Sequence, residues 1–179
     1  LYPDHLGTMY SGSAVTDYEN TAGYNRDNVP AMIVAYTAAS PDKQVQCIAY
    51  SLDNGRTFTK YPENPVIDSK HIWNSIETRD PKVFWYKPGK HWVMVLNERD
   101  GHSIYISSNL KEWTYQSHIT GFWECPELFE LPIDGDPNNT KWVMYGATGT
   151  YMLGSFNGKV FKPEMGKYQY TTGSIYAAQ

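Results

Sequence analysis

Short apolar runs, each about the length of a β-strand, recur along the chain between turns rich in Gly, Asn, Asp and Pro. Apolar runs bounded by turn residues are typical of buried strands. We expect strands at residues 9–15, 31–38, 45–51, 92–96, 103–107, 141–146 and 150–155. No segment shows a sustained helical period with capping residues at its ends. The pattern therefore predicts an all-β chain.

Similar segments return at regular intervals, which indicates an internal repeat. Trp92-Val93-Met94 recurs as Trp142-Val143-Met144, and Ser51, Ser107 and Ser155 each precede a turn and an aromatic residue. A period of roughly 40–55 residues with four short strands per unit is typical of β-propeller blades. We expect about two full blades and parts of two others. Because a propeller must close to hide its strand edges, and because the chain does not begin with Met, we expect a piece of a larger protein.

The hairpin at residues 51–58 carries Asn54-Gly55 at its turn, a pair that favours tight hairpin turns. Its spacing matches the Asp-box of several propellers, in which an acid and a threonine, here Asp53 and Thr57, tie the hairpin together. We expect a structural role for this hairpin, because the acid of an Asp-box usually faces away from the active cavity.

Twice in the chain an acid stands just before a proline and an apolar strand, at Asp80 and at Glu124. Proline lacks the N–H of a strand ladder and is confined to strand starts and edges. At the mouth of a buried strand a carboxyl group can act as a proton donor. The two acids fall at matching positions of successive predicted blades, where the first strand lines the central channel. Both carboxyl groups should therefore face one cavity, an arrangement that glycoside hydrolysis uses.

Each candidate residue also has a structural interpretation. Glu124 could form an ion pair with Arg79 or a lysine, and Asp80 could make an Asp-Pro turn. Cys125 could fill the core as a small apolar side chain, and Trp73 could pack within its loop rather than stack on a sugar. The small residues at positions 11–13 would admit a ligand or, equally, a tight contact between blades.

Composition argues against several classes of partner. Fifteen basic and 19 acidic residues give a net charge of −4, so no basic stripe is available for nucleic acid or anionic lipid. No apolar run is long enough to span a membrane, the five histidines lack metal-ligand spacing, and no cofactor is implied. The 15 Tyr, 6 Trp and 6 Phe suit sugar stacking but also suit an all-β core.

At these residues the chain resembles glycoside hydrolase family 32, the group of invertases, inulinases and levanases. Three motifs of the family stand in order, at residues 10–15 (YSGSAV), 79–81 (RDP) and 124–126 (ECP). Residues 2–7 (YPDHLG) are more similar to exo-acting fructan hydrolases than to sucrose-6-phosphate hydrolases. The resemblance runs along essentially the whole chain.

The resemblance implies a five-bladed propeller followed by a β-sandwich, and cleavage of β-fructosyl linkages with retention of configuration. By motif, Glu124 corresponds to the general acid/base and Asp80 to a stabiliser of the transition state. Arg79 would hold these two acids in their working charge states. Three further residues correspond to positions that shape the pocket or contact the fructosyl ring: Tyr10, Ser11 and Cys125.

The nucleophile of the family lies in an N-terminal Trp-x-Asn-Asp-Pro-Asn-Gly motif, which this sequence does not contain. Chemistry alone would make Asp80 the nucleophile, because retaining enzymes use two acids about 5 Å apart, but the family pattern overrides that. We therefore expect residues 1–179 to be a partial catalytic propeller, with the nucleophile strand and the sandwich outside the chain. Many relatives also carry an acid just before the tyrosine that matches Tyr176, which Ser174 and Ile175 do not supply.

The sequence thus predicts a fragment of an exo-acting hydrolase of sucrose, inulin or levan, and the resemblance favours a secreted or periplasmic location. Two alternatives remain open. A non-catalytic sugar-binding propeller would explain the aromatics and the repeat, but it does not need two matched acids. A related five-bladed glycosidase acting on arabinan or xylan, or a fructosyltransferase, would keep the paired acids but gives no reason for Glu-Cys-Pro.

Overall fold

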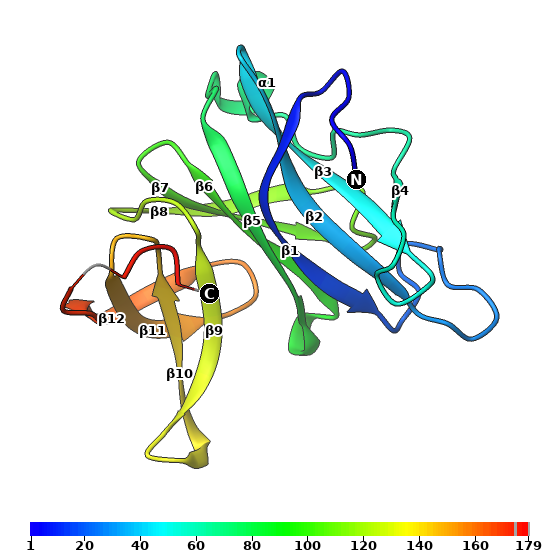
Figure 1. The fold of residues 1–179 in the computed structure, drawn as a ribbon. Coiled ribbons are helices and arrows are strands. Elements are labelled where there is room, and N and C mark those ends of the chain that lie inside the picture. The colour runs from blue at the N-terminus through cyan, green and yellow to red at the C-terminus, as the bar shows by residue number, and fades with distance from the viewer. Residues whose placement is uncertain (174, 179) are drawn as a thin grey trace.

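The computed structural model describes residues 1–173 and 175–178. These residues form three antiparallel sheets of four strands each, which lie side by side (Figure 1). In each sheet the strands are ordered as they follow in the chain, as in the blades of a propeller.

The elements divide evenly among the three sheets. The first sheet contains β1 (Thr8–Asp17), β2 (Ala31–Ser40), β3 (Lys43–Ser51) and β4 (Thr59–Lys60). The second contains β5 (Thr78–Tyr86), β6 (His91–Glu98), β7 (Gly101–Ser107) and β8 (Thr114–Thr120). The third contains β9 (Glu127–Ile133), β10 (Asp136–Tyr145), β11 (Thr150–Phe156) and β12 (Phe161–Gln169). The helix α1 (Ser69–Trp73) and the 3-10 turn η1 (Lys87–Gly89) lie before and after β5.

Strand β6 shows why its apolar run is unbroken. Side chains alternate between the two faces of a strand, and β6 lies in the middle sheet. Met94 and Leu96 pack into the core shared with the first sheet, whereas Val93 and Val95 pack into the core shared with the third. All four side chains are fully buried. Burial on both faces replaces the usual alternation of polar and apolar residues with a continuous apolar run.

The prediction of an all-β chain built from four-stranded blades is confirmed, but the number of blades was wrong. The structure has three four-stranded sheets rather than two full blades and parts of two others. Three strands were not predicted, for physical reasons: β4 has only two residues, β8 has no fully buried position, and β12 is exposed at eight of its nine positions, so none of them shows a buried apolar run. Residues 175–178 form no strand, and Ser174 and Gln179 lie outside the described residues.

The predicted structural hairpin is confirmed, and its geometry recurs in every blade. The Asp53 carboxylate accepts hydrogen bonds from the Thr57 hydroxyl (2.7 Å) and from the Thr57 N–H (2.9 Å). These bonds, above all the one from the Thr57 hydroxyl, lower the pKa of Asp53. Asn109 and Asn157 each accept two backbone N–H groups at the corresponding turns of the second and third blades. The serine repeat in the sequence therefore marks a turn closed by side-chain hydrogen bonds.

Small residues in β1 serve close contacts between strands. A Cβ atom at Gly12 would lie 2.0 Å from the Ala35 carbonyl oxygen of β2. The Ser13 hydroxyl donates to the Pro81 carbonyl (2.8 Å) and accepts from the Val83 N–H (2.9 Å), which joins β1 to β5 of the next blade. The tight contact between blades that the sequence left open is therefore present at Ser13.

We expect Gly12→Ala to destabilise the protein, because the added methyl group collides with backbone rather than with a mobile side chain. Overpacking of a closely packed site costs about 1–3 kcal/mol. The check is urea unfolding of the full-length protein beside Ser11→Ala, a neighbouring exposed position that should keep the wild-type midpoint. Equal midpoints for both variants and the wild type would contradict the close approach.

Candidate active site

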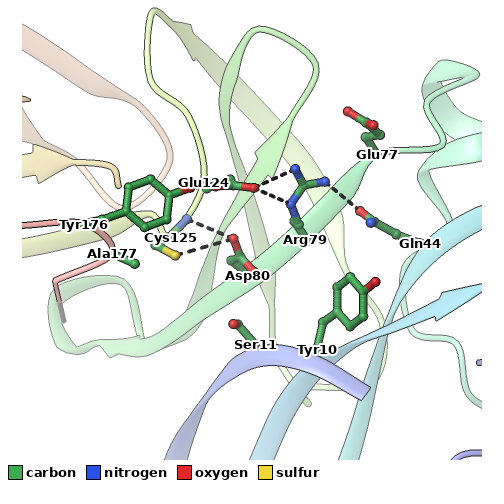
Figure 2. A pocket seen from close by; sticks show the side chains of 10 residues that line it. All are labelled: Tyr10, Ser11, Gln44, Glu77, Arg79, Asp80, Glu124, Cys125, Tyr176 and Ala177. Carbon is green, nitrogen blue, oxygen red and sulfur yellow. Dashed lines mark hydrogen bonds and ion pairs between the residues drawn. The ribbon is translucent and has the colours of Figure 1, made fainter. Parts of the chain in front are cut away.

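A cavity of about 650 Å³ opens where the inner strands of the three blades come together (Figure 2). Its lining contains four residues of charged types, Glu77, Arg79, Asp80 and Glu124. The other six are polar or small: Tyr10, Ser11, Gln44, Cys125, Tyr176 and Ala177. The structure thus brings together six of the seven residues that the sequence singled out, the exception being Trp73.

Each blade turns its side chains into the cavity at an irregularity of the backbone. In β1 the register with β2 shifts between Met9 and Gly12, and in β5 the register with β6 shifts between Arg79 and Lys82. In the third blade the irregularity lies at Glu124, just before β9. Bulges of this kind bend a strand and re-aim its side chains, so a regular strand could not present these residues in the same way.

Asp80 is the most deeply buried carboxyl group of the cavity, with 7% of its surface exposed. Its φ of 62° places it in the left-handed region, and its N–H donates to the Thr37 hydroxyl at 3.0 Å. Its Oδ2 accepts the Cys125 N–H at 3.0 Å. Asp80 therefore ties the second blade to the segment that carries Glu124.

Arg79 holds Glu124 through one oxygen only. Its Nε and Nη2 donate to Glu124 Oε1 at 3.0 and 2.7 Å, and its Nη1 donates to Gln44 Oε1 at 3.1 Å. The guanidinium also lies 5.4 Å from the centre of the Trp123 ring. Glu124 Oε2 does not contact Arg79 in this arrangement and instead accepts the Tyr176 hydroxyl. Each oxygen of the Glu124 carboxyl group therefore accepts from a different residue, Oε1 from Arg79 and Oε2 from Tyr176.

The whole chain, residues 1–179, matches the family model described as the N-terminal domain of glycosyl hydrolases family 32. The chain belongs to glycoside hydrolase family 32. The family predicted from the three sequence motifs is therefore confirmed.

Family 32 relatives match along most of this chain. A levanase of Bacillus subtilis is 48% identical over 92% of the chain, and invertase 1 of Saccharomyces cerevisiae is 40% identical over 86%. An exo-inulinase structure from Aspergillus awamori superposes with a TM-score of 0.79 at 36% identity over 88% of the chain, and 37% of that structure is covered. The chain spans only 26% of the levanase and 32% of the invertase.

A second solved family 32 structure supports the same fold. A β-fructofuranosidase from Schwanniomyces occidentalis, complexed with fructosyl-erythritol, superposes with a TM-score of 0.80 at 37% identity. It covers 91% of this chain, which corresponds to 35% of that structure. The three sheets are therefore blades of a family 32 propeller.

Cys125 lies in the wall of the cavity rather than in an apolar core. Burial, reinforced by the charge of Asp80, raises the pKa of its thiol to about 12. The thiol therefore stays protonated at neutral pH, and it donates to Asp80 Oδ2 at 3.6 Å. Cys125 acts here as a hydrogen-bond donor, since a nucleophilic cysteine requires a thiolate.

Trp73 does not reach the cavity. Its indole N–H donates to the Tyr105 hydroxyl at 3.1 Å, and its ring meets Tyr115 edge to face at 4.7 Å between centroids. The Arg99 guanidinium covers its other side at 4.5 Å from the ring centre. The loop-packing interpretation of Trp73 therefore describes its contacts, and Trp73 is not among the residues that line this cavity.

Sequence reasoning missed several residues of the lining, chiefly Gln44 and Glu77. Gln44 lies in β3, and its N–H donates to the Ile76 carbonyl at 3.1 Å, next to Glu77. No local motif marks either residue, because they reach the cavity through the pairing of distant segments. Tyr176 was noted only through the family pattern, and it lies against Glu124 despite the absent acid before it.

Among residues 1–173 and 175–178, no helix is long and apolar enough to cross a membrane. Within the same described residues, no group of three or more His, Cys, Asp or Glu side chains is placed to hold a metal ion.

His102 lies beneath this site, fully buried in β7, and burial lowers its pKa to about 3. An unfolded chain binds this proton near pH 6.5, so between these two values the unfolded state holds more protons. The free energy of unfolding should therefore rise with pH from about 3 to about 6.5, by up to about 1.4 kcal/mol per pH unit.

The measurement compares urea unfolding of full-length wild type and His102→Phe across this pH range. The Phe ring keeps the stacking of His102 on Phe122 but has no site for a proton. The slope of the free energy of unfolding against pH should therefore be smaller in the variant, by up to about 1.4 kcal/mol per pH unit. Identical slopes in the two proteins would show that His102 is protonated without cost in the folded state.

Proposed function

We propose that the full-length protein is a retaining glycoside hydrolase that releases terminal fructose from β-fructosides, namely sucrose, inulin or levan. One observation carries this proposal: Glu124, held through a single oxygen by Arg79, shares a cavity with the buried Asp80. The names of the relatives, which include levanase, invertase and exo-inulinase, support the substrate class.

Glu124 is assigned as the general acid/base. In the first step its Oε2 gives a proton to the leaving oxygen while a nucleophilic carboxylate from outside these 179 residues bonds to the fructosyl anomeric carbon and the bond from that carbon to the leaving oxygen breaks. In the second step it takes a proton from the water that attacks the same carbon and displaces that carboxylate, which releases fructose. Because Arg79 occupies Oε1, the proton stays on the oxygen that faces the cavity.

Asp80 is assigned as the stabiliser of the transition state. Its charge and its remaining hydrogen-bonding capacity face fructosyl hydroxyl groups as the ring gains positive character. Tyr10, half exposed at the rim, and Ser11 are assigned to the sugar ring. Arg79 and Cys125 are assigned to holding the two acids in place.

The nucleophile is assigned to neither acid of this cavity. We propose that a carboxylate from residues outside these 179 supplies it, because the chain spans a third or less of the levanase and invertases it matches. In this proposal, residues 1–179 are part of the catalytic propeller and do not complete the active site by themselves.

The test is product analysis with the full-length protein on sucrose, inulin and levan. Fructose should be the first and only small product released from the two polymers, and early NMR spectra should show the β-anomer of the released sugar. Oligosaccharides from the start would contradict exo action. Binding of these sugars without any hydrolysis would favour the non-catalytic propeller, and transfer to a second sugar would favour a fructosyltransferase.

A further inference from the structure

The segment that presents Glu124 has a strained backbone. Glu124 and Cys125 have φ angles of 52° and 41°, in the left-handed region that side chains other than glycine rarely adopt. Each such residue costs roughly 1–2 kcal/mol. The conformation therefore persists only because surrounding groups fix it.

Asn97 of β6 makes the shortest of the backbone contacts that fix this segment. Its Oδ1 accepts the Glu124 N–H at 2.7 Å. The identity of this atom is certain from chemistry, since a backbone N–H can only donate and the facing amide atom must be the oxygen. Asn97 is fully buried, so its amide is held in one orientation directly beneath the acid/base.

The third blade supports the same segment from the other side. The Ala147 N–H donates to the Trp123 carbonyl (2.9 Å) and to the Glu124 carbonyl (3.0 Å). The preceding Gly146 has no room for a side chain, because a Cβ atom there would lie 2.9 Å from the Trp123 oxygen. The Glu124 carbonyl and N–H are therefore held from different blades, and among residues 1–173 and 175–178 it is Asn97 that accepts the N–H.

Only one end of the Asn97 amide has a hydrogen-bond partner, namely the oxygen that accepts the Glu124 N–H. Its Nδ2 is buried and finds no hydrogen-bond partner among the described residues. A buried polar group without a partner costs about 1–3 kcal/mol. An apolar side chain of the same size would remove the unpartnered Nδ2 but would also remove the acceptor of the Glu124 N–H, so the useful property of Asn97 at this position is its acceptor oxygen.

We propose that Asn97 is a positioning residue for Glu124, whose amide oxygen fixes the left-handed turn that aims the carboxyl group into the cavity. The proposal rests on the proposed role of Glu124 as acid/base. Without this acceptor, the Glu124 N–H has no partner and the turn relaxes toward ordinary φ values. The carboxyl group then moves away from the position set by Arg79, and a displacement of about 1 Å can cost a hundredfold in rate.

The experiment is a double-mutant cycle in the full-length protein, with Asn97→Leu and Glu124→Gln alone and combined. Asn97→Leu should lower kcat on the natural substrates by about 10–100-fold with little change in KM. In the Glu124→Gln background it should cost nothing further, because its effect passes through the acid that is already absent.

A second measurement distinguishes a misplaced Glu124 carboxyl group from partial unfolding of the enzyme. With activated fructosides whose phenolate leaving groups need no proton, Asn97→Leu should recover most of its rate, whereas a partly unfolded enzyme loses the same fraction on every substrate. The control is Asn138→Leu, the same substitution at an exposed position of β10 that does not line the cavity, and it should keep wild-type kcat.

The outcomes are distinguishable. Wild-type kcat in Asn97→Leu, or an equal loss in both backgrounds, overturns the role of Asn97 while leaving the proposed function intact. Full activity in Glu124→Gln alone overturns the proposed function itself. If Asn97→Leu does not fold, Asn97→Ala removes the same acceptor without adding bulk and carries the same cycle.

Discussion

Glu124→Gln in the full-length protein is expected to lower kcat on sucrose, inulin and levan by about 10²–10⁴-fold while the fold survives. The amide oxygen of glutamine can still accept both hydrogen bonds from Arg79, so the segment keeps its place. The amide cannot give a proton to the leaving oxygen, and the loss should therefore fall on kcat rather than on KM.

Steady-state kinetics with natural and activated fructosides check this result. The loss should be much smaller for a phenolate leaving group, which departs without a proton. Glu130→Gln is a matched control, since Glu130 is an exposed acid of β9 bonded to Thr140 and lies outside the cavity. Unchanged kcat in Glu124→Gln would remove the assignment of Glu124 as acid/base.

Asp80→Asn is expected to lower kcat/KM by about 10²–10³-fold, the scale of losing one preorganised electrostatic contact to a developing charge. Asparagine is the same size, and its Oδ1 can still accept the Cys125 N–H that Asp80 now accepts at 3.0 Å. The fold should therefore hold, and the loss should reflect the missing negative charge opposite the fructosyl ring.

Kinetics and urea unfolding of Asp80→Asn together distinguish a loss of activity caused by the missing charge from one caused by lower stability. Asp53→Asn makes the same chemical change at the hairpin turn of the first blade, away from the cavity, and should keep wild-type kcat. If Asp80→Asn lost stability in proportion to its activity, Asp80 would be a structural residue that joins two blades rather than a stabiliser of the transition state.

Much of the fold follows from local pattern. β6 was recognisable because both of its faces are buried, and the hairpin turns were recognisable because Asp53 and its Asn counterparts close them by short-range hydrogen bonds. β4, β8 and β12 were not recognisable, because pairing with a neighbouring strand defines them while their own side chains form no buried apolar run. The count of blades therefore had to come from the tertiary structure.

The sequence also determined the acids of the site. Asp80 and Glu124 stand before prolines at matched places in the repeat, and any propeller built on that repeat turns both toward its channel. What only the tertiary structure decided is how these acids are held. Arg79 donates two hydrogen bonds to one oxygen of Glu124, and Asn97 accepts the Glu124 N–H. The physical reason is the separation along the chain over which each kind of interaction acts. Strand pattern and turn chemistry act between neighbours in the chain, whereas a hydrogen bond between residues of different blades exists only after the sheets have packed.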